Sequence, residues 1–591
     1  MFKKRASAGA AALLLVASQL SAAELTRGPY LQQTTSQSTT LRWRTDVATD
    51  SVVRYGTVPG NLTGIVANPL ITTEHEVLVD GLSPDTRYYY SVGSFTEIVG
   101  GDDANHSFRT HPTPGTDREG GVTIWVTGDQ GAGCNEGPGP GCGTATSSCI
   151  AGRVRDRAMD VAGGPGDIDA WIALGDNAYG FPGHPDATDG AYQNGLFCPF
   201  SEILRQTAIW PCVGNHDLNG PGPANHDQQF TLPANGEAGG FPSGTERWYS
   251  FDVGVVHLVS LQWDNLDPGD AMALWLVADL ASNTQPWTIV YLHGPPHTFG
   301  SHNSDAENTL IAYRQVLTPI LEAGGVDLVL AGHSHNYERS ALIDSGFWGY
   351  SYEFQAAMHE LDSGDGDPAG DGAYVKTSDN GVVHAVVGNS SKGGAPIASP
   401  HPVVRFTRSG NGSALVNVTC DELVFEYVDQ YNFITDTFTI RKPGNCPPSS
   451  CAAGTAPGGF RSLRVNGSAG DASGLVQLPA GGPMVVSVEY DQPATLNALE
   501  VFGRAGLATP AEAVFIPGWG EFCFAPQMFN PDNPKLFSLG ILKTPGPYVL
   551  PWSRTYSIPA NWAGVRFELQ GGGANGLDRR VTNCVTVEIV P

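Results

Sequence analysis

Five apolar runs in the middle of the chain each end in residues that can bind a metal ion. In chain order the five junctions are Gly128-Asp129-Gln130-Gly131, Gly175-Asp176-Asn177-Ala178-Tyr179, Gly214-Asn215-His216-Asp217, Val290-Tyr291-Leu292-His293 and Gly332-His333-Ser334-His335. A single Gly-Asp after a strand is most often a turn or a helix cap. Five junctions of this kind, each after an apolar run, indicate a fold that gathers several strand ends around one site.

The same region alternates between strand patterns and helix patterns. Strand-like runs such as GVTIWVTGD and WTIVYLHGPPH are separated by helical patterns at residues 150–162 and 307–324. In α/β folds ligands bind at the carboxyl ends of the strands, where the five junctions lie. His333 and His335 are two residues apart, so both can face one object. The sequence therefore predicts an α/β domain over residues 118–442, with its ligand at the strand ends.

The segments on either side of this domain have β patterns of their own. Residues 24–112 alternate apolar and polar positions in short runs with turn signals between them, which predicts a small β-sandwich. The run LSPDTRYYYSV near its end resembles the close of a fibronectin type III domain. A Cys/Pro/Gly-rich linker at 443–458 leads to residues 459–591, for which we expect a second β-sandwich of unknown role, with a surface, a glycan or the enzyme itself as candidate partners.

The first residues predict export. Residues 1–23 have a basic start, a short apolar stretch and small residues before Ala23, as a secretory signal peptide does. We therefore expect a secreted or periplasmic protein with no membrane insertion, in which the even number of cysteines, 10, favours disulfides. Only Cys523 and Cys584 are assignable as a pair. A formal net charge of −27 argues against nucleic acid or an anionic membrane as partner.

Taken together, the five junctions resemble the metallophosphatase domain of the purple acid phosphatases, within the calcineurin-like phosphoesterases. The resemblance covers residues 24–442, because the fibronectin-like module in front also matches the plant-type members. It implies a central β-sandwich flanked by helices and a small phosphate ester as substrate. It does not explain residues 459–591.

The resemblance implies two metal sites that share one carboxylate. Asp176 would bridge them, with three further ligands at the first site and three at the second: Asp129, Tyr179 and His335, then Asn215, His293 and His333. Two carboxylates and a phenolate suit Fe(III), whereas an amide and two imidazoles suit divalent Zn, Mn or Fe. Many relatives carry a ligand histidine where this chain has Gly131, so Tyr179 is expected to be the substitute ligand.

The same resemblance suggests which groups act on the substrate. Two metal ions lower the pKa of a bound water, and the resulting hydroxide attacks phosphorus in line. His216 would face the leaving group, and Asp217 would orient it. His302 stands where plant-type members carry a substrate-facing histidine, although Asn303 replaces the second histidine that often follows. His297 is expected to be a solvated loop residue.

We therefore expect an exported acid phosphatase that hydrolyses phosphate monoesters. The same site could instead serve phosphodiesters or nucleotides, because subdomain loops rather than these motifs decide that preference. A third hypothesis is a non-enzymatic exported binding protein with a vestigial site. The intact set of seven ligand residues argues against it, since a drifting site should have lost at least one.

Overall fold

The computed structural model describes residues 22–443 and the strands of the C-terminal segment. The gaps within the first range are 134–148, 182–183, 221–222, 265, 344–346, 378–379 and 395. The expected signal peptide lies outside the described residues as far as residue 21, and so does most of the expected linker. Within the described part, no helix is both long enough and apolar enough to cross a membrane.

The N-terminal segment forms a β-sheet domain, as its period-two pattern predicts. Its six strands are β1 (Leu25–Gln32), β2 (Thr39–Gly56), β3 (Gly64–Val79), β4 (Arg87–Gly93), β5 (Ile98–Gly101) and β6 (Ser107–Arg109). The long strand β2 pairs with β1, β3 and β4. Leu41 and Trp43 are buried while Arg42 between them is partly exposed, so successive side chains face opposite sides of the sheet. The likeness to fibronectin type III stays a prediction.

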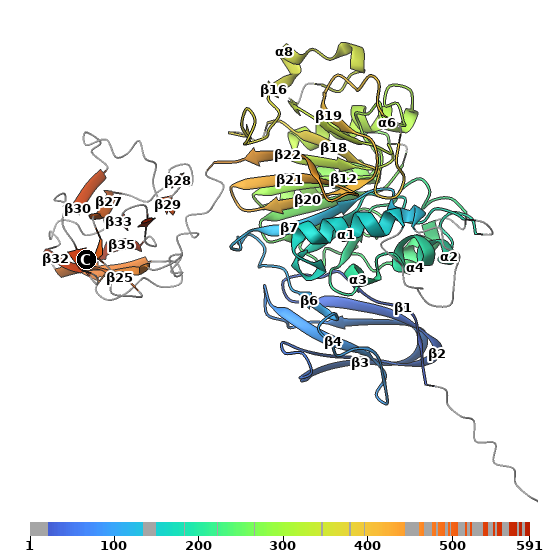
Figure 1. The fold of residues 1–591 in the computed structure, drawn as a ribbon, viewed down its shortest axis with the longest axis horizontal. Coiled ribbons are helices and arrows are strands. Elements are labelled where there is room, and N and C mark those ends of the chain that lie inside the picture. Colours follow the sequence, from blue (N-terminus) through green and yellow to red (C-terminus); the bar gives the residue numbers. More distant parts are fainter. Residues whose placement is uncertain are drawn as a thin grey trace, which may run out of the picture.

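The central domain is built on two seven-stranded sheets (Figure 1). The first sheet runs in the order β10 (Tyr249–Val253), β11 (Val256–Leu261), β12 (Trp287–Leu292), β13 (Leu328–Ala331), β18 (Val383–Val387), β14 (Tyr337–Ser340) and β19 (Val404–Arg408). The second runs β17 (Tyr374–Val375), β22 (Ile434–Arg441), β21 (Glu422–Asp429), β20 (Gly412–Val418), β7 (Val122–Thr127), β8 (Ala170–Ala173) and β9 (Ile209–Pro211). The run β11-β12-β13-β18 is parallel, and so is β7-β8-β9.

Large aromatic side chains fill the core of this domain. Trp125, Trp171, Trp210 and Trp287 are fully buried, and the Trp210 ring stacks on Phe251 with centroids 3.7 Å apart. Trp210 belongs to one sheet and Phe251 to the other, so this stack joins the two. Cys212, just beyond β9, is buried and is the free cysteine of the described residues. Six of the ten cysteines lie outside that part of the chain, so disulfide pairing stays a prediction.

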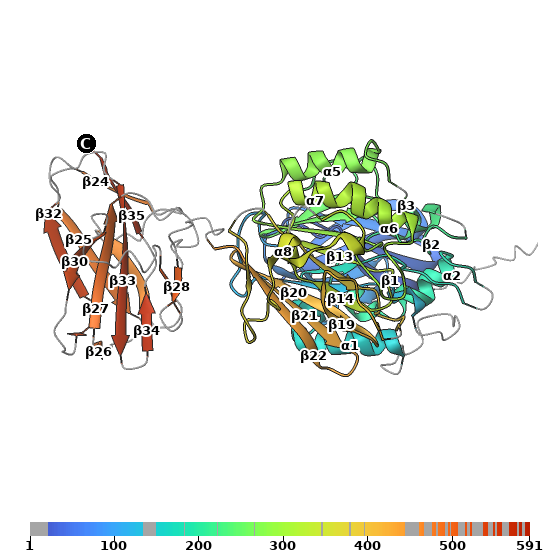
Figure 2. The ribbon, with the colours of Figure 1, turned by 90° about the horizontal axis from the view of Figure 1, so that it is seen from above.

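Helices cover the outer faces of the sheets. Figure 2 shows α5 (Ala271–Ser282) and α7 (Thr318–Ala323) together on one side, with α1 (Ile150–Ala162) on the other. The helical pattern at 307–324 forms two helices, α6 (Asn308–Ala312) and α7, joined by a π-helical turn at Tyr313–Leu317. Pro319 lacks an N–H group and cannot donate to the carbonyl one turn back, which favours such an interruption. Shorter helices lie in the connections: α2 (Asp189–Tyr192), α3 (Ser201–Leu204), α4 (Pro223–Gln229) and α8 (Ala356–His359).

The C-terminal segment consists of strands where the structure describes it. They run from β23 (Phe460–Val465) to β35 (Val585–Val590). Two sheets account for most of them. The first has the order β23, β25 (Pro483–Tyr490) and β32 (Trp552–Ser557), and the second has the order β24 (Leu475–Pro479), β35, β33 (Arg566–Asn575), β27 (Ala498–Ala505) and β30 (Leu536–Ile541). The expected sandwich arrangement of this segment stays a prediction.

Candidate metal centre

The site lies where parallel strands of both sheets end. Strands β7, β8 and β9 end at Thr127, Ala173 and Pro211, and strands β12 and β13 end at Leu292 and Ala331. All seven side chains proposed as ligands follow these ends within a few residues. Because parallel strands present their carboxyl ends at a common edge, the fold brings these side chains together.

The first group of donors surrounds the phenol of Tyr179. Its hydroxyl oxygen lies 2.7 Å from Asp129 Oδ1, 2.7 Å from Asp176 Oδ2 and 3.4 Å from His335 Nε2. His335 Nε2 is also 3.3 Å from Asp129 Oδ1. Three oxygen donors of the type that a hard cation prefers and one imidazole nitrogen therefore converge on one point.

The second group shares Asp176 with the first. His293 Nε2 lies 3.3 Å from Asp176 Oδ1 and 3.0 Å from Asn215 Oδ1. His333 Nδ1 lies 3.1 Å from the same amide oxygen of Asn215. Since each oxygen of Asp176 belongs to a different group, this carboxylate is placed to bridge two cations.

Unusual backbone conformations hold three of these side chains in place. Asp129, Asp176 and His333 have φ values of 55°, 53° and 66°, in the left-handed region that side chains other than glycine rarely adopt. Such positions persist only where the surrounding structure enforces them, and they cluster at functional sites. At Gly131 a Cβ atom would lie 2.3 Å from the carbonyl carbon of Asn177. A histidine at this position has no room, so the ligand pattern with Tyr179 agrees with the local backbone.

The pKa shifts of Asp176, His293 and Tyr179 indicate that the carboxylates concentrate negative charge at the site. Burial alone would raise the pKa of Asp176, but the charge and hydrogen bond of His293 outweigh burial and hold it well below its usual range. Burial lowers the pKa of His293, yet Asp176 raises it to about 9. The pKa of the Tyr179 phenol is raised by burial and by the Asp129 and Asp176 carboxylates. A cation at this position would replace the proton on His293 and would favour the phenolate.

The burial of the donor residues suits a metal ion, as does the chemistry of their ligand atoms. Asp129, Asp176 and His293 are all buried, and their ligand atoms lie within 4.8 Å of one another. Buried carboxylates are found paired or bound to metals, because an isolated buried charge is costly. These residues can therefore hold the metal that their chemistry implies.

His216 lies beside this centre, but its expected partner is different. Its Nδ1 is 2.7 Å from Asp186 Oδ2, and its ring lies 4.4 Å from the Tyr179 ring. Asp217 does not orient it, because that carboxylate is buried and accepts hydrogen bonds from Asn177 and from the backbone N–H of Gly214. The expectation for Asp217 was therefore wrong, and Asp186 takes the orienting position.

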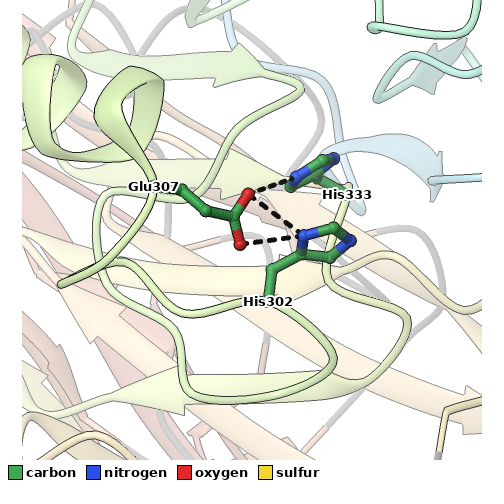
Figure 3. Close-up of side chains that lie close together, drawn as sticks. All are labelled: His302, Glu307 and His333. Atoms are coloured by element: carbon green, nitrogen blue, oxygen red, sulfur yellow. Dashed lines mark hydrogen bonds and ion pairs between the residues drawn. The ribbon is translucent and has the colours of Figure 1, made fainter.

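His302 reaches the site, and His297 does not. The His302 ring lies against the His333 ring, tilted by 33° with centroids 3.7 Å apart, and its Nδ1 is 3.0 Å from Glu307 Oε1 (Figure 3). His297 is 2% exposed and packs against the buried rings of His384 and His401. The expectation of a solvated loop histidine at 297 was wrong, because its loop folds inward over strand β18.

Sequence reasoning missed four residues that touch the proposed ligands or His216. Asp186 contacts His216, Glu307 contacts His333, the Trp263 ring lies 4.7 Å from the His333 ring, and Lys392 Nζ lies 4.2 Å from the centre of the Tyr179 ring. None belongs to a junction motif. Trp263, two residues beyond β11, follows a strand end as the ligands do, and that position was the one available signal.

Comparison with known proteins shows similarity in the two N-terminal domains. Residues 122–337 match the model of the calcineurin-like phosphoesterases, and residues 27–110 match the purple acid phosphatase N-terminal domain. Purple acid phosphatase 23 of Arabidopsis thaliana is 27% identical over 339 residues, 53% of this chain and 63% of that protein. Probable purple acid phosphatase 20 of the same plant is 26% identical over 330 residues, 51% of this chain and 66% of that protein. The chain thus spans slightly less than two thirds of these relatives.

A solved structure shares the fold. The purple acid phosphatase from yellow lupin (Lupinus luteus) seeds aligns with a TM-score of 0.50 and 18% identity, over 71% of this chain and 74% of that one. The two matched family models occupy the N-terminal sheet domain and the strands that carry the donor groups. Residues 122–337 therefore form a calcineurin-like phosphoesterase domain, and with the N-terminal domain in front of it the chain is similar to the purple acid phosphatases.

Proposed function

We propose that this protein is an exported phosphatase that uses two metal ions to hydrolyse phosphate monoesters. The observation that carries the proposal is the pair of donor groups that share Asp176, each built from side chains of both sheets. Residues 1–23, with the pattern of a signal peptide, support export.

The two groups differ in a way that supports an asymmetric metal pair. Two carboxylates, a phenol and one imidazole favour a trivalent ion such as Fe(III), whereas two imidazoles, an amide and the shared carboxylate favour divalent Zn, Mn or Fe. When bound, two such ions supply Lewis acidity, which activates water as a nucleophile and neutralises charge on the phosphoryl oxygens.

The protein's own side chains supply proton transfer and orientation. His216 is partly exposed, and its Nδ1 is occupied by Asp186, so its other nitrogen is directed away from that carboxylate. Held in this way, it is placed to protonate a leaving alkoxide or to stabilise the transition state. His302 is also partly exposed and fixed through Nδ1, which suits it to contact a phosphate oxygen.

Metal analysis combined with two substrates tests the proposal. We expect about two metal ions per purified chain and a higher kcat/KM on p-nitrophenyl phosphate than on bis-p-nitrophenyl phosphate. A higher value on the diester would assign the site to phosphodiesters. A fully metal-loaded protein that hydrolyses neither compound would contradict the enzymatic proposal and favour a binding role.

A further inference from the structure

The carboxylate of Glu307 lies between two histidine rings of the centre. Its Oε2 is 3.3 Å from His333 Nε2 and 3.1 Å from His302 Nδ1, and its Oε1 is 3.0 Å from His302 Nδ1. Figure 3 shows the carboxylate facing both rings at once. One acidic side chain thus contacts a proposed metal ligand and a proposed substrate-facing residue.

The environment of His333 decides which of its nitrogens carries the proton. A neutral imidazole has one N–H and one lone pair, and a metal takes the lone pair. Nδ1 faces the Asn215 amide oxygen, which also contacts His293, so this nitrogen belongs to the proposed second metal site. Nε2 then carries the proton and donates it to Glu307, as ligand histidines commonly do to a carboxylate.

His302 is held by the same carboxylate but faces a different way. Its Nδ1 contacts both oxygens of Glu307, so this nitrogen carries the N–H and Nε2 keeps the lone pair. The side chain is 30% exposed, whereas that of His333 is 7% exposed. No hydrogen bond from His302 Nε2 to another described group accompanies this contact, so Nε2 remains available to a ligand in the open part of the site.

Glu307 is fixed by the chain around it. The Asn303 N–H donates to Glu307 Oε1 at 3.0 Å, and the Glu307 N–H donates to the Asn303 carbonyl at 3.1 Å. The carbonyl of Glu307 accepts from Ile311 in the first turn of α6. These bonds join the carboxylate to the loop that carries His302 and to the helix that follows it.

We propose that Glu307 is a positioning residue that couples the second metal to the substrate-facing histidine. It fixes the proton on Nε2 of His333 and the proton on Nδ1 of His302. Loss of its carboxylate weakens metal retention and misorients His302 in one step. The inference rests on the proposed function for the role of His302, but its metal arm stands independently of phosphatase activity.

A rival role for the same three residues is a metal site of their own. Ligand atoms of His302, Glu307 and His333 lie within 4.8 Å of one another, which is close enough to hold a cation. To serve this site as well as the proposed second metal site, His333 would have to lose its N–H proton and bind through both nitrogens. Metal stoichiometry separates the two roles, because a site here in addition to the proposed pair would give three ions per chain.

The experiment compares Glu307→Gln with Glu307→Asp and with Glu353→Gln, a control at an exposed carboxylate that bonds the backbone N–H of Tyr350. Metal affinity is measured by competition with a chelator, and folding by circular dichroism. We expect Glu307→Gln to hold the more weakly bound ion about 10–100-fold less tightly, the usual effect of removing the partner of a ligand histidine. Glu307→Asp keeps the charge and should fall between Glu307→Gln and wild type, while Glu353→Gln should match wild type.

A second arm tests the coupling to His302. At saturating metal we expect Glu307→Gln to lower kcat about 10-fold, and to lower it less than about 2-fold in a His302→Phe background, because residues that act as a unit are not additive. Unchanged metal affinity in folded Glu307→Gln would overturn the proposal, and so would three ions in wild type with one lost on substitution. A wild type that binds two ions but hydrolyses no phosphate ester would refute the proposed function and leave the affinity test decisive.

Discussion

Asp186 and Asp217 offer a direct test of which carboxylate orients His216. The motif Asn215-His216-Asp217 favours the adjacent Asp217, whereas the structure places Asp186 Oδ2 2.7 Å from His216 Nδ1. We expect Asp186→Asn to lower kcat about 10–100-fold, the range for the outer partner of a functional histidine. That loss equals about 1.4–2.7 kcal/mol of transition-state stabilisation. As a reference, His216→Ala should lower kcat by roughly 10²–10⁴-fold, the scale for a positioned acid or base.

Asp217→Asn should act on folding instead. The Asp217 carboxylate accepts from the Asn177 side chain at 2.9 Å, from the Gly214 N–H at 2.9 Å and from the Tyr192 hydroxyl at 3.1 Å. An amide at this position turns one acceptor into a donor, and each buried donor left unpaired costs about 1–3 kcal/mol. Asp186 is partly exposed, so its substitution should change the free energy of unfolding by less than about 1 kcal/mol.

The assay pairs kcat on p-nitrophenyl phosphate at saturating metal with chemical unfolding of each variant. All variants should keep about two metal ions, since no proposed ligand is removed. Wild-type kcat in a folded, metal-loaded Asp186→Asn would refute the orienting role. Loss of kcat with unchanged stability in Asp217→Asn would return that role to the residue next to His216.

Three further predictions concern colour, pH and chain length. Tyr179→Phe should abolish the visible charge-transfer band of an oxidised, iron-loaded enzyme while some hydrolysis remains; a loaded wild type with no such band would contradict Fe(III)-phenolate ligation. Asp252 and Asp279 raise the pKa of buried His257 to about 9 against the effect of burial. The contribution of protonated His257 to the free energy of unfolding, on the order of 3 kcal/mol, should therefore be complete below about pH 6.5. It should be lost as pH rises through about 9. Unfolding curves of wild type and His257→Gln should converge at high pH, and a constant difference would refute this assignment. A chain that ends near residue 445 should keep its activity on small phosphate esters, because all proposed ligands precede that point, and an inactive but metal-loaded product would place the C-terminal segment at the site.

The sequence could predict the strand ends because they are local features. Each proposed ligand follows an apolar run directly, so pattern and chemistry coincide within a few residues. The N-terminal sheet was equally accessible, because Leu41 and Trp43 alternate with polar neighbours on one strand. In both cases the information needed lies within one element.

The partners of the histidines were not predictable in this way. Asp186 lies 30 positions from His216, and Glu307 lies 26 positions from His333. Their positions depend on how loops fold back over the strand ends, and no periodicity encodes that path. Proximity in sequence favoured Asp217, but its carboxylate is turned inward to hold the Gly214 backbone. His297 was misplaced for the same reason, since a loop residue can be buried by the segment that closes over it.

The centre combines strained backbone conformations with buried carboxylates, and the requirements of a metal site account for both. Asp129, Asp176 and His333 adopt left-handed conformations that cost stability, and two of them add buried carboxylates to the cost. A fold selected for stability alone would place glycine at the strained positions and apolar side chains at the buried ones. The left-handed conformations instead turn the residues after three strands toward the site. As a result, one oxygen of Asp176 faces the first donor group and the other faces the second. A bound cation stabilises the folded state by mass action, so the arrangement that destabilises the metal-free protein is the one that a metal-loaded protein requires.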